Sequence, residues 1–114
     1  MPNQKTISKA ILFNGVGLHT GNEVNLEIVP APENHGIKFQ RTDVENQPII
    51  PASVDFVTDT QRSTTIEKNN IKVVTIEHLM SALYALEINN VLIKIDGPEA
   101  VSYTHLTLPT MLMV

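Results

Sequence analysis

The sequence predicts an α+β domain in which an antiparallel or mixed β-sheet is layered against a helix. Segments with alternating hydrophobicity occupy the first two thirds of the chain, and one segment with helical spacing follows them before a last extended stretch. The chain has 114 residues, of which 42% are hydrophobic and 18% charged, so it is long and apolar enough to form one domain with its own core.

Composition and charge exclude several classes of protein. Lys and Arg total 8 and Asp and Glu total 12, for a formal net charge of −4, whereas a generic nucleic-acid-binding protein normally carries a basic patch. The absence of cysteine rules out disulfides, thiolate zinc ligands and a cysteine nucleophile, and it fits a reducing compartment. No stretch approaches the roughly 20 apolar residues of a membrane span, and the N-terminus lacks a signal-peptide pattern. We therefore expect a cytoplasmic protein without a stable membrane span or a nucleic-acid partner.

Strands are predicted through the first part of the chain. Residues 5–13 mix β-branched and apolar residues and lead into the glycine-rich stretch GVGLHTG at 15–21, which predicts a tight turn. Residues 23–30 alternate strictly between apolar and polar positions, as a half-buried strand does. The residues on one face of this segment are Val24, Leu26 and Ile28. Turn-forming residues fill 31–36, and the alternation resumes over 37–43.

Two further extended segments precede the helix. Residues 49–60 are predicted to be extended, with a break at Pro51 near their start. Residues 63–75 are predicted to form a hairpin whose turn is Asn69-Asn70, because asparagine tolerates the positive φ that tight hairpin turns require.

The hydrophobic period then changes from that of a strand to that of a helix. Residues 76–87 are rich in good helix formers, and Thr75 is a predicted N-cap. The apolar residues at helical spacing are Ile76, Leu79, Met80, Leu83 and Leu86. The predicted helix exit is Asn89-Asn90, followed by a strand at 91–96. The last segment, 100–114, has no charged residue and differs in character from the rest of the chain.

The pair Glu77-His78, in the first turn of the predicted helix, is the strongest candidate for chemistry. An imidazole there is a candidate zinc ligand, and the neighbouring carboxylate is placed to accept a proton from a water that zinc activates. The same pair also fits an ordinary helix start, since the macrodipole favours a glutamate in the first turn. Spacing alone leaves both interpretations open, because the i+4 position is Ala82 and the motif supplies a single imidazole.

Three other residues are weaker candidates from the sequence alone. The glycine-rich loop at 15–21 does not fit a dinucleotide-binding fingerprint, because Thr20 occupies the third glycine position and a strand follows instead of a helix. His19 in this loop either lines a cleft or belongs to a simple tight turn. Arg62 either neutralises an anionic ligand or is solvated, and Ser63 has no sequence partners that would make it a nucleophile.

Several motifs, taken in series, resemble one family. They are GVGLHTG (15–21), VPAPENHGIKFQRTD (29–43), DTQRSTT (59–65) and TIEHLMSALYALEINNVLIKIDGPE (75–99). In their order and spacing they resemble the zinc-dependent UDP-3-O-acyl-N-acetylglucosamine deacetylases of lipid A biosynthesis. The resemblance runs from Lys5 to Glu99.

The resemblance implies an amide hydrolase that removes the acetyl group from a UDP-linked, 3-O-acylated glucosamine. It implies that His78 is a zinc ligand and Glu77 the general base, with the other zinc ligands supplied by a second domain. His19, Arg62 and Ser63 match positions close to the metal and substrate, which implies substrate-binding roles. The family's fold consists of two similar sandwich domains, and this chain resembles the first of them.

The resemblance ends abruptly near the C-terminus. We expect residues 1–99 to be an incomplete N-terminal deacetylase domain and residues 100–114 to be a foreign or out-of-frame tail. The second-domain motif of the HKxxD type is missing, so the chain alone is expected to be inactive. Two alternatives remain. One is a fragment of a bifunctional enzyme fused to a 3-hydroxyacyl-carrier-protein dehydratase, whose branch the segment 31–43 resembles. The other is a noncatalytic α+β module.

Overall fold

The computed structural model describes residues 4–16, 21, 23–60, 64–100 and 111–113. Its elements in chain order are β1 (Lys5–Ile7), β2 (Ile11–Val16), β3 (Glu23–Pro30), β4 (Ile37–Arg41), β5 (Ile49–Pro51), the 3₁₀ helix η1 (Val54–Phe56), β6 (Val57–Asp59), β7 (Thr65–Lys68), β8 (Ile71–Val73), α1 (Glu77–Ala85), β9 (Val91–Ile95) and β10 (Met111–Met113).

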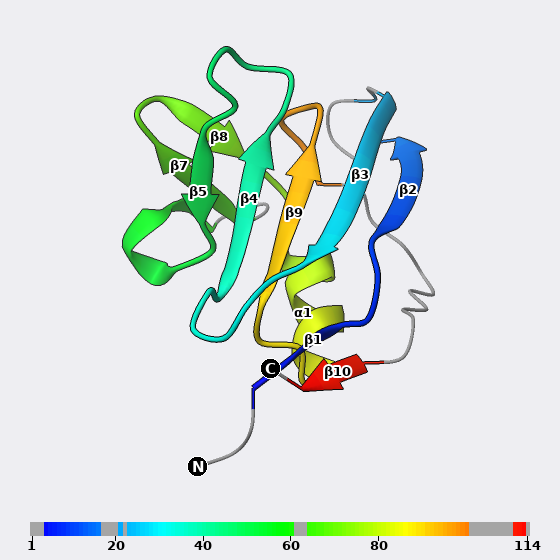
Figure 1. The fold of residues 1–114 in the computed structure, drawn as a ribbon. Helices are drawn as coiled ribbons and strands as arrows, with labels where there is room; N and C mark the ends of the chain where they lie inside the picture. Colours follow the sequence, from blue (N-terminus) through cyan, green and yellow to red (C-terminus); the bar gives the residue numbers. More distant parts are fainter. Residues whose placement is uncertain (1–3, 17–20, 22, 61–63, 101–110, 114) are drawn as a thin grey trace.

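A five-stranded sheet forms the centre of the fold, with strand order β2-β3-β9-β4-β5 (Figure 1). Its pairs are antiparallel except β4 with β9, which run parallel. Two smaller sheets accompany it: β6-β7-β8, and β1 paired with β10. Strands and one helix in the described residues confirm the α+β class.

The alternation predicted for residues 23–30 is confirmed in β3. Val24, Leu26 and Ile28 are buried at 1% exposure or less, while Asn25 and Glu27 point to the other face. Burying one face of a strand fixes its register, because a shift of one residue would turn every apolar side chain outward. This strand therefore anchors the sheet on both sides, pairing with β2 and β9.

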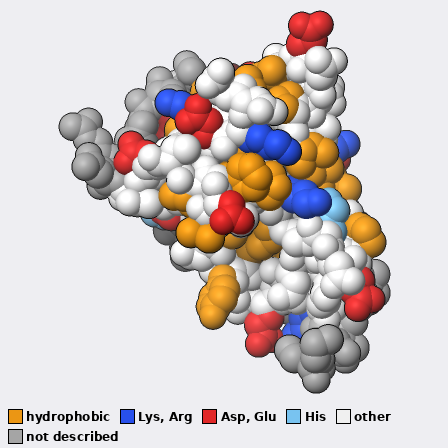
Figure 2. Space-filling model, turned by 90° about the vertical axis from the view of Figure 1, so that its left-hand side faces the viewer, with side chains coloured by type: hydrophobic (Ala, Val, Ile, Leu, Met, Phe, Trp, Pro, Cys, Tyr) orange, Lys and Arg blue, Asp and Glu red, His pale blue; other side chains and the backbone are white. Residues whose placement is uncertain are grey.

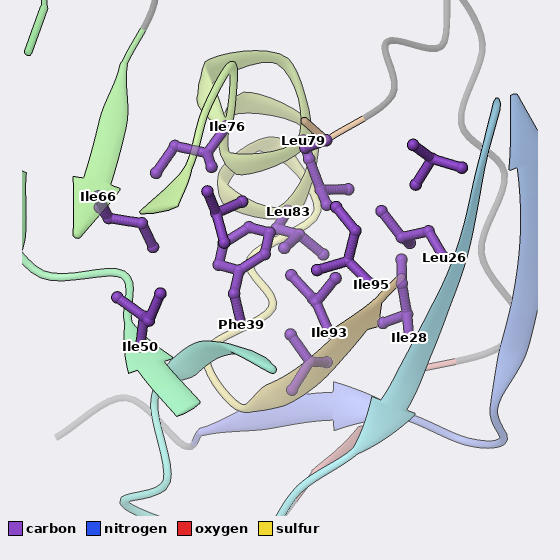
Figure 3. Packing of buried hydrophobic residues seen from close by; sticks show 14 of the residues in the cluster. Leu26, Ile28, Phe39, Ile50, Ile66, Ile76, Leu79, Leu83, Ile93 and Ile95 are labelled. Carbon is purple, nitrogen blue, oxygen red and sulfur yellow. The ribbon is translucent and has the colours of Figure 1, made fainter. Parts of the chain in front are cut away.

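The core fills the space between the sheet and α1. Leu79 and Leu83 of the helix point toward Phe39, Ile93 and Ile95 of the sheet (Figure 3). All five side chains are at most 4% exposed. Their packing holds the start of the helix in a fixed position relative to the sheet, which matters because Glu77 and His78 lie there.

The N-terminal segment, predicted to have strand character over residues 5–13, contains two strands. It is divided into β1 and β2, which belong to different sheets, and the intervening residues 8–10 are exposed. The Thr6 hydroxyl donates to the Asn90 carbonyl and accepts from the Ala31 N–H, so β1 is tied to loops outside the central sheet. Gly15 and Val16, which were predicted to belong to the glycine-rich turn, lie in β2.

The segment 49–60 is interrupted after Pro51, close to the predicted break, by a helical turn that was not predicted. Strands β5 and β6 are separated by η1, and the Ser53 side chain accepts a hydrogen bond from the Asp55 N–H at its start. Serine favours such local side-chain-to-backbone bonds, which compete with strand formation. The predicted hairpin, by contrast, is confirmed: β7 and β8 pair antiparallel, and Asn69 and Asn70 have φ of 53° and 67°.

The helix is shorter than the predicted 76–87, and Thr75 is not its N-cap. The cap residue is Ile76, which makes no side-chain capping bond, while Thr75 has φ 61° and directs its hydroxyl to Glu99. The helix also ends before the predicted Asn89-Asn90 exit. Glu87, with φ 59°, takes the left-handed position that terminates it. Its N–H bonds to the Tyr84 carbonyl, and the next N–H bonds to the Leu83 carbonyl, the pattern of a Schellman motif.

The helices of the described segments are too short or too polar to cross a membrane. In the C-terminal segment, β10 pairs with β1 in antiparallel register from Lys5 opposite Met113 to Ile7 opposite Met111.

Candidate functional site

The first turn of α1 brings Glu77 and His78 together. Glu77 is the first residue of the helix, and its Oε2 lies 3.8 Å from His78 Nε2. The side chains are 35% and 51% exposed, respectively, so both reach solvent and are accessible to a ligand. A carboxylate at this end of a helix is favoured by the positive end of the macrodipole.

Thr64, the residue before β7, holds the Glu77 carboxylate in one orientation. The Thr64 N–H donates to Glu77 Oε1 at 2.9 Å, and the Thr64 carbonyl accepts from the Ile76 N–H at 3.2 Å. Both backbone groups of Thr64 therefore bond to the start of the helix. With Oε1 engaged in this way, Oε2 is the oxygen that faces the imidazole.

The residues just before α1 are also hydrogen-bonded to the segment that follows β9. The Val74 N–H donates to the Pro98 carbonyl at 2.7 Å, and the Ala100 N–H donates to the Val74 carbonyl at 3.0 Å. The Thr75 hydroxyl donates to Glu99 Oε2 at 3.0 Å, and Glu99 is fully buried. The residues at the start of α1 are thus joined both to Thr64, just before β7, and to the segment after β9.

The described residues at this position offer two possible metal ligands, one imidazole and one carboxylate. Among the described residues, no group of three or more His, Asp and Glu side chains is placed to hold a metal ion. Tight zinc sites normally take at least three protein ligands. An accessible imidazole beside a carboxylate therefore fits part of a zinc site.

Three of the predicted site residues are not tested by the structure. His19, Arg62 and Ser63 lie outside the described residues. Sequence reasoning also missed two residues around the pair. Thr64 acts through its backbone groups, which the identity of its side chain does not reveal. Glu99 is buried, although glutamate is a residue type usually found at the surface.

The surface of the domain carries hydrophobic side chains as well. Figure 2 shows them gathered near the middle of the face formed by the β5 edge of the fold, among side chains of both charges. A hollow of about 540 Å³ is lined in part by Met80, Ser81 and Tyr84 of α1. Neither Glu77 nor His78 lines this hollow, so it is separate from the candidate site.

Together the fold and site define a class: an α+β domain with a paired carboxylate and imidazole at a helix start, the side-chain types used in hydrolytic metal sites. Residues 4–101 match the sequence model of LpxC, UDP-3-O-acyl N-acetylglycosamine deacetylase. The chain belongs to this family, which confirms the resemblance found in its motifs.

Individual relatives agree with the family. The chain is 52% identical over 99 residues to the bifunctional enzyme LpxC/FabZ of Bacteroides thetaiotaomicron, covering 87% of the chain and 22% of that protein. It is 46% identical over 99 residues to the bifunctional enzyme LpxC/FabZ of Porphyromonas gingivalis, covering 87% of the chain and 21% of the relative. It is 46% identical over 97 residues to the UDP-3-O-acyl-N-acetylglucosamine deacetylase of Myxococcus xanthus, covering 85% of the chain and 31% of the relative. The chain thus spans less than a third of the length of these relatives.

Proposed function

We propose that this chain supplies the general base and one zinc ligand of a cytoplasmic deacetylase in lipid A biosynthesis. The substrate is UDP-3-O-(3-hydroxyacyl)-N-acetylglucosamine, whose acetamide bond is hydrolysed to an amine and acetate. The observation that carries the proposal is the pairing at the start of α1, where Glu77 Oε2 lies 3.8 Å from His78 Nε2. Membership of the family, over residues 4–101, supplies the substrate class.

The donor set supports a shared metal centre. His78 would hold Zn²⁺ through an exposed imidazole, and the remaining ligands would come from a second domain outside this chain. Zinc, when bound, acts as a Lewis acid toward the amide carbonyl and lowers the pKa of a water to about 7. In this proposal the chain is the first of two similar sandwich domains, each with a sheet layered against helices, and it is inactive alone.

Glu77 performs the proton transfer in this scheme. Its Oε2 accepts a proton from the attacking water while the water oxygen bonds to the acetamide carbon. The Thr64 N–H, 2.9 Å from Oε1, holds the carboxylate so that the other oxygen faces the reacting water. The C–N bond then breaks, and the leaving amine takes a proton from a group on the second domain. His19, Arg62 and Ser63 are proposed to contact the substrate.

A bifunctional protein is the second candidate. Three relatives, including those from Bacteroides thetaiotaomicron and Porphyromonas gingivalis, are named bifunctional LpxC/FabZ enzymes, and the first has 52% identity to this chain. In that case a 3-hydroxyacyl-carrier-protein dehydratase would follow the deacetylase in the complete protein. The role proposed for Glu77 and His78 is the same in both candidates, and it is absent from the alternative of a noncatalytic module.

A chimeric enzyme tests the proposal. Residues 4–99 of this chain replace the matching segment of the Bacteroides thetaiotaomicron relative, with the unmodified relative as positive control. We expect acetate release from the UDP-linked substrate, loss of release on treatment with a chelator, and recovery on addition of Zn²⁺. The 114-residue chain alone should release none. A folded chimera that releases no acetate under conditions where the parent enzyme does would refute the proposed function.

A further inference from the structure

The turn before α1 contains an unusual backbone conformation. Thr75 has φ 61°, in the left-handed region that a β-branched residue rarely occupies, and it is 1% exposed. A side chain makes this conformation unfavourable, because the Cβ atom comes close to the following carbonyl oxygen. Such strain persists only where the surrounding structure imposes it. The position is two residues before Glu77 and three before His78.

A buried carboxylate, that of Glu99, holds the side chain of Thr75 in place. Glu99 is 0% exposed, and its Oε2 accepts the Thr75 hydroxyl at 3.0 Å. Burying a carboxylate is costly unless it is hydrogen-bonded. If the position of Glu99 served only to fill the core, an apolar residue would fill it at lower cost. The backbones are fixed as well, through the parallel bridge between Val74 and Glu99. The carboxylate therefore sits where it constrains the rotation of Thr75.

The conformation of Thr75 determines where the helix begins and in which direction it points. The next residue, Ile76, donates its N–H to the Thr64 carbonyl at 3.2 Å. Glu77 Oε1 in turn accepts from the Thr64 N–H at 2.9 Å. A change of φ at Thr75 would turn the peptide group that carries the Ile76 N–H and would shift the helix start from which the Glu77 side chain extends. The carboxylate of Glu77 would then lose its alignment with the Thr64 N–H.

We propose that Glu99 is a positioning residue, which holds Thr75 in its left-handed turn and thereby sets the orientation of Glu77 and His78. This proposal rests on the proposed function, since it assigns Glu99 to the geometry of the base. Glu99 itself does not touch the reacting atoms in this scheme. It acts through the Thr75 hydroxyl, so removal of that hydroxyl should lower turnover, as removal of the carboxylate does.

Kinetics of the chimeric enzyme give the first test. Thr75→Val keeps the shape of the side chain and removes the hydroxyl, whereas Thr75→Ser keeps the hydroxyl. We expect Thr75→Val and Glu99→Ala to lower kcat at least about tenfold with KM within about twofold, because misalignment affects the reacting step. Thr75→Ser, and Glu99→Gln with its remaining acceptor oxygen, should recover most of that loss. If Thr75→Val lowers the melting temperature but leaves kcat per folded enzyme as in the parent chimera, the role is merely structural and the proposal is wrong.

Amide hydrogen exchange in the 114-residue chain gives a test that needs no activity. The Thr64 amide reports directly on its bond to Glu77, and the Gly36 amide, which bonds to Asn90 Oδ1, serves as the internal control. Thr75→Val should accelerate exchange at Thr64 and leave Gly36 unchanged, and Thr75→Ser should restore the slow rate. An inactive parent chimera would refute the proposed function, and the exchange rates would still decide on Glu99. Unchanged exchange at Thr64 in Thr75→Val would overturn the positioning role.

Discussion

Asn90 joins three parts of the fold, and its replacement by alanine has a calculable cost. The side chain is 1% exposed; its Oδ1 accepts from the Gly36 N–H at 2.8 Å, and its Nδ2 donates to Gln4 Oε1 at 2.8 Å. Each lost hydrogen bond costs about 1 kcal/mol, and a donor left without a partner at Gly36 adds roughly 1–2 kcal/mol. Asn90→Ala should therefore lower the free energy of unfolding by about 3–4 kcal/mol.

The neighbouring asparagine provides a matched control. Asn89 is exposed, and its Oδ1 accepts one bond, from the Lys5 N–H at 2.9 Å. Water can replace that bond, so Asn89→Ala should cost about 0.5–1 kcal/mol. Urea unfolding of the 114-residue chain, followed by circular dichroism, measures both free energies. Equal losses for the two variants, or a loss below about 1 kcal/mol for Asn90→Ala, would refute the argument that burial of the bonds sets the cost.

Three further predictions concern packing, pH and the hairpin turn. Leu83→Ala removes a fully buried core side chain and should cost about 2–5 kcal/mol in urea unfolding, whereas Tyr84→Ala, at a position 86% exposed, should change stability by about 0.5 kcal/mol or less. The hydrogen bonds from Arg41 lower the pKa of Asp43, so the stability contributed by this carboxylate is present above about pH 4 and is lost as the pH falls through the lowered pKa. Between pH 6 and pH 2, the free energy of unfolding should therefore fall less in Asp43→Asn than in the unmodified chain. Equal decreases in the two proteins would contradict the assignment. Asn70 has φ 67°, so Asn70→Val should cost roughly 1–2 kcal/mol while Asn70→Gly is tolerated, and thermal unfolding that ranks them in the opposite order would contradict this reasoning.

Local patterns predicted those parts of the fold that depend on neighbouring residues. The alternation in 23–30 gave both the strand and its buried face, because that pattern records which side packs on the core. The Asn69-Asn70 turn was predictable because few residues other than glycine adopt positive φ at low cost. The proximity of Glu77 and His78 was also predictable from the sequence, because the two residues are neighbours in the first turn of one helix.

The features that the sequence did not predict depend on contacts between distant segments. The break between β1 and β2 follows from the bonds of Thr6 to Asn90 and Ala31, which hydropathy does not encode. The burial of Glu99 and the positive φ of Thr75 arise together, through one hydrogen bond across 24 positions. Residue type suggested an N-cap at Thr75, and no pattern in the sequence indicated that Glu99 is buried.

The most direct test of the proposed chemistry separates zinc content from turnover in the chimeric enzyme. His78→Ala should lose bound zinc and deacetylation together, because the imidazole is a metal ligand in the proposal. Glu77→Ala should retain zinc and lower kcat by about 10²–10⁴-fold, as removal of a general base does. Elemental analysis of the purified variants, combined with acetate release, measures both quantities. Loss of zinc in Glu77→Ala together with its retention in His78→Ala would contradict the roles assigned to the two residues.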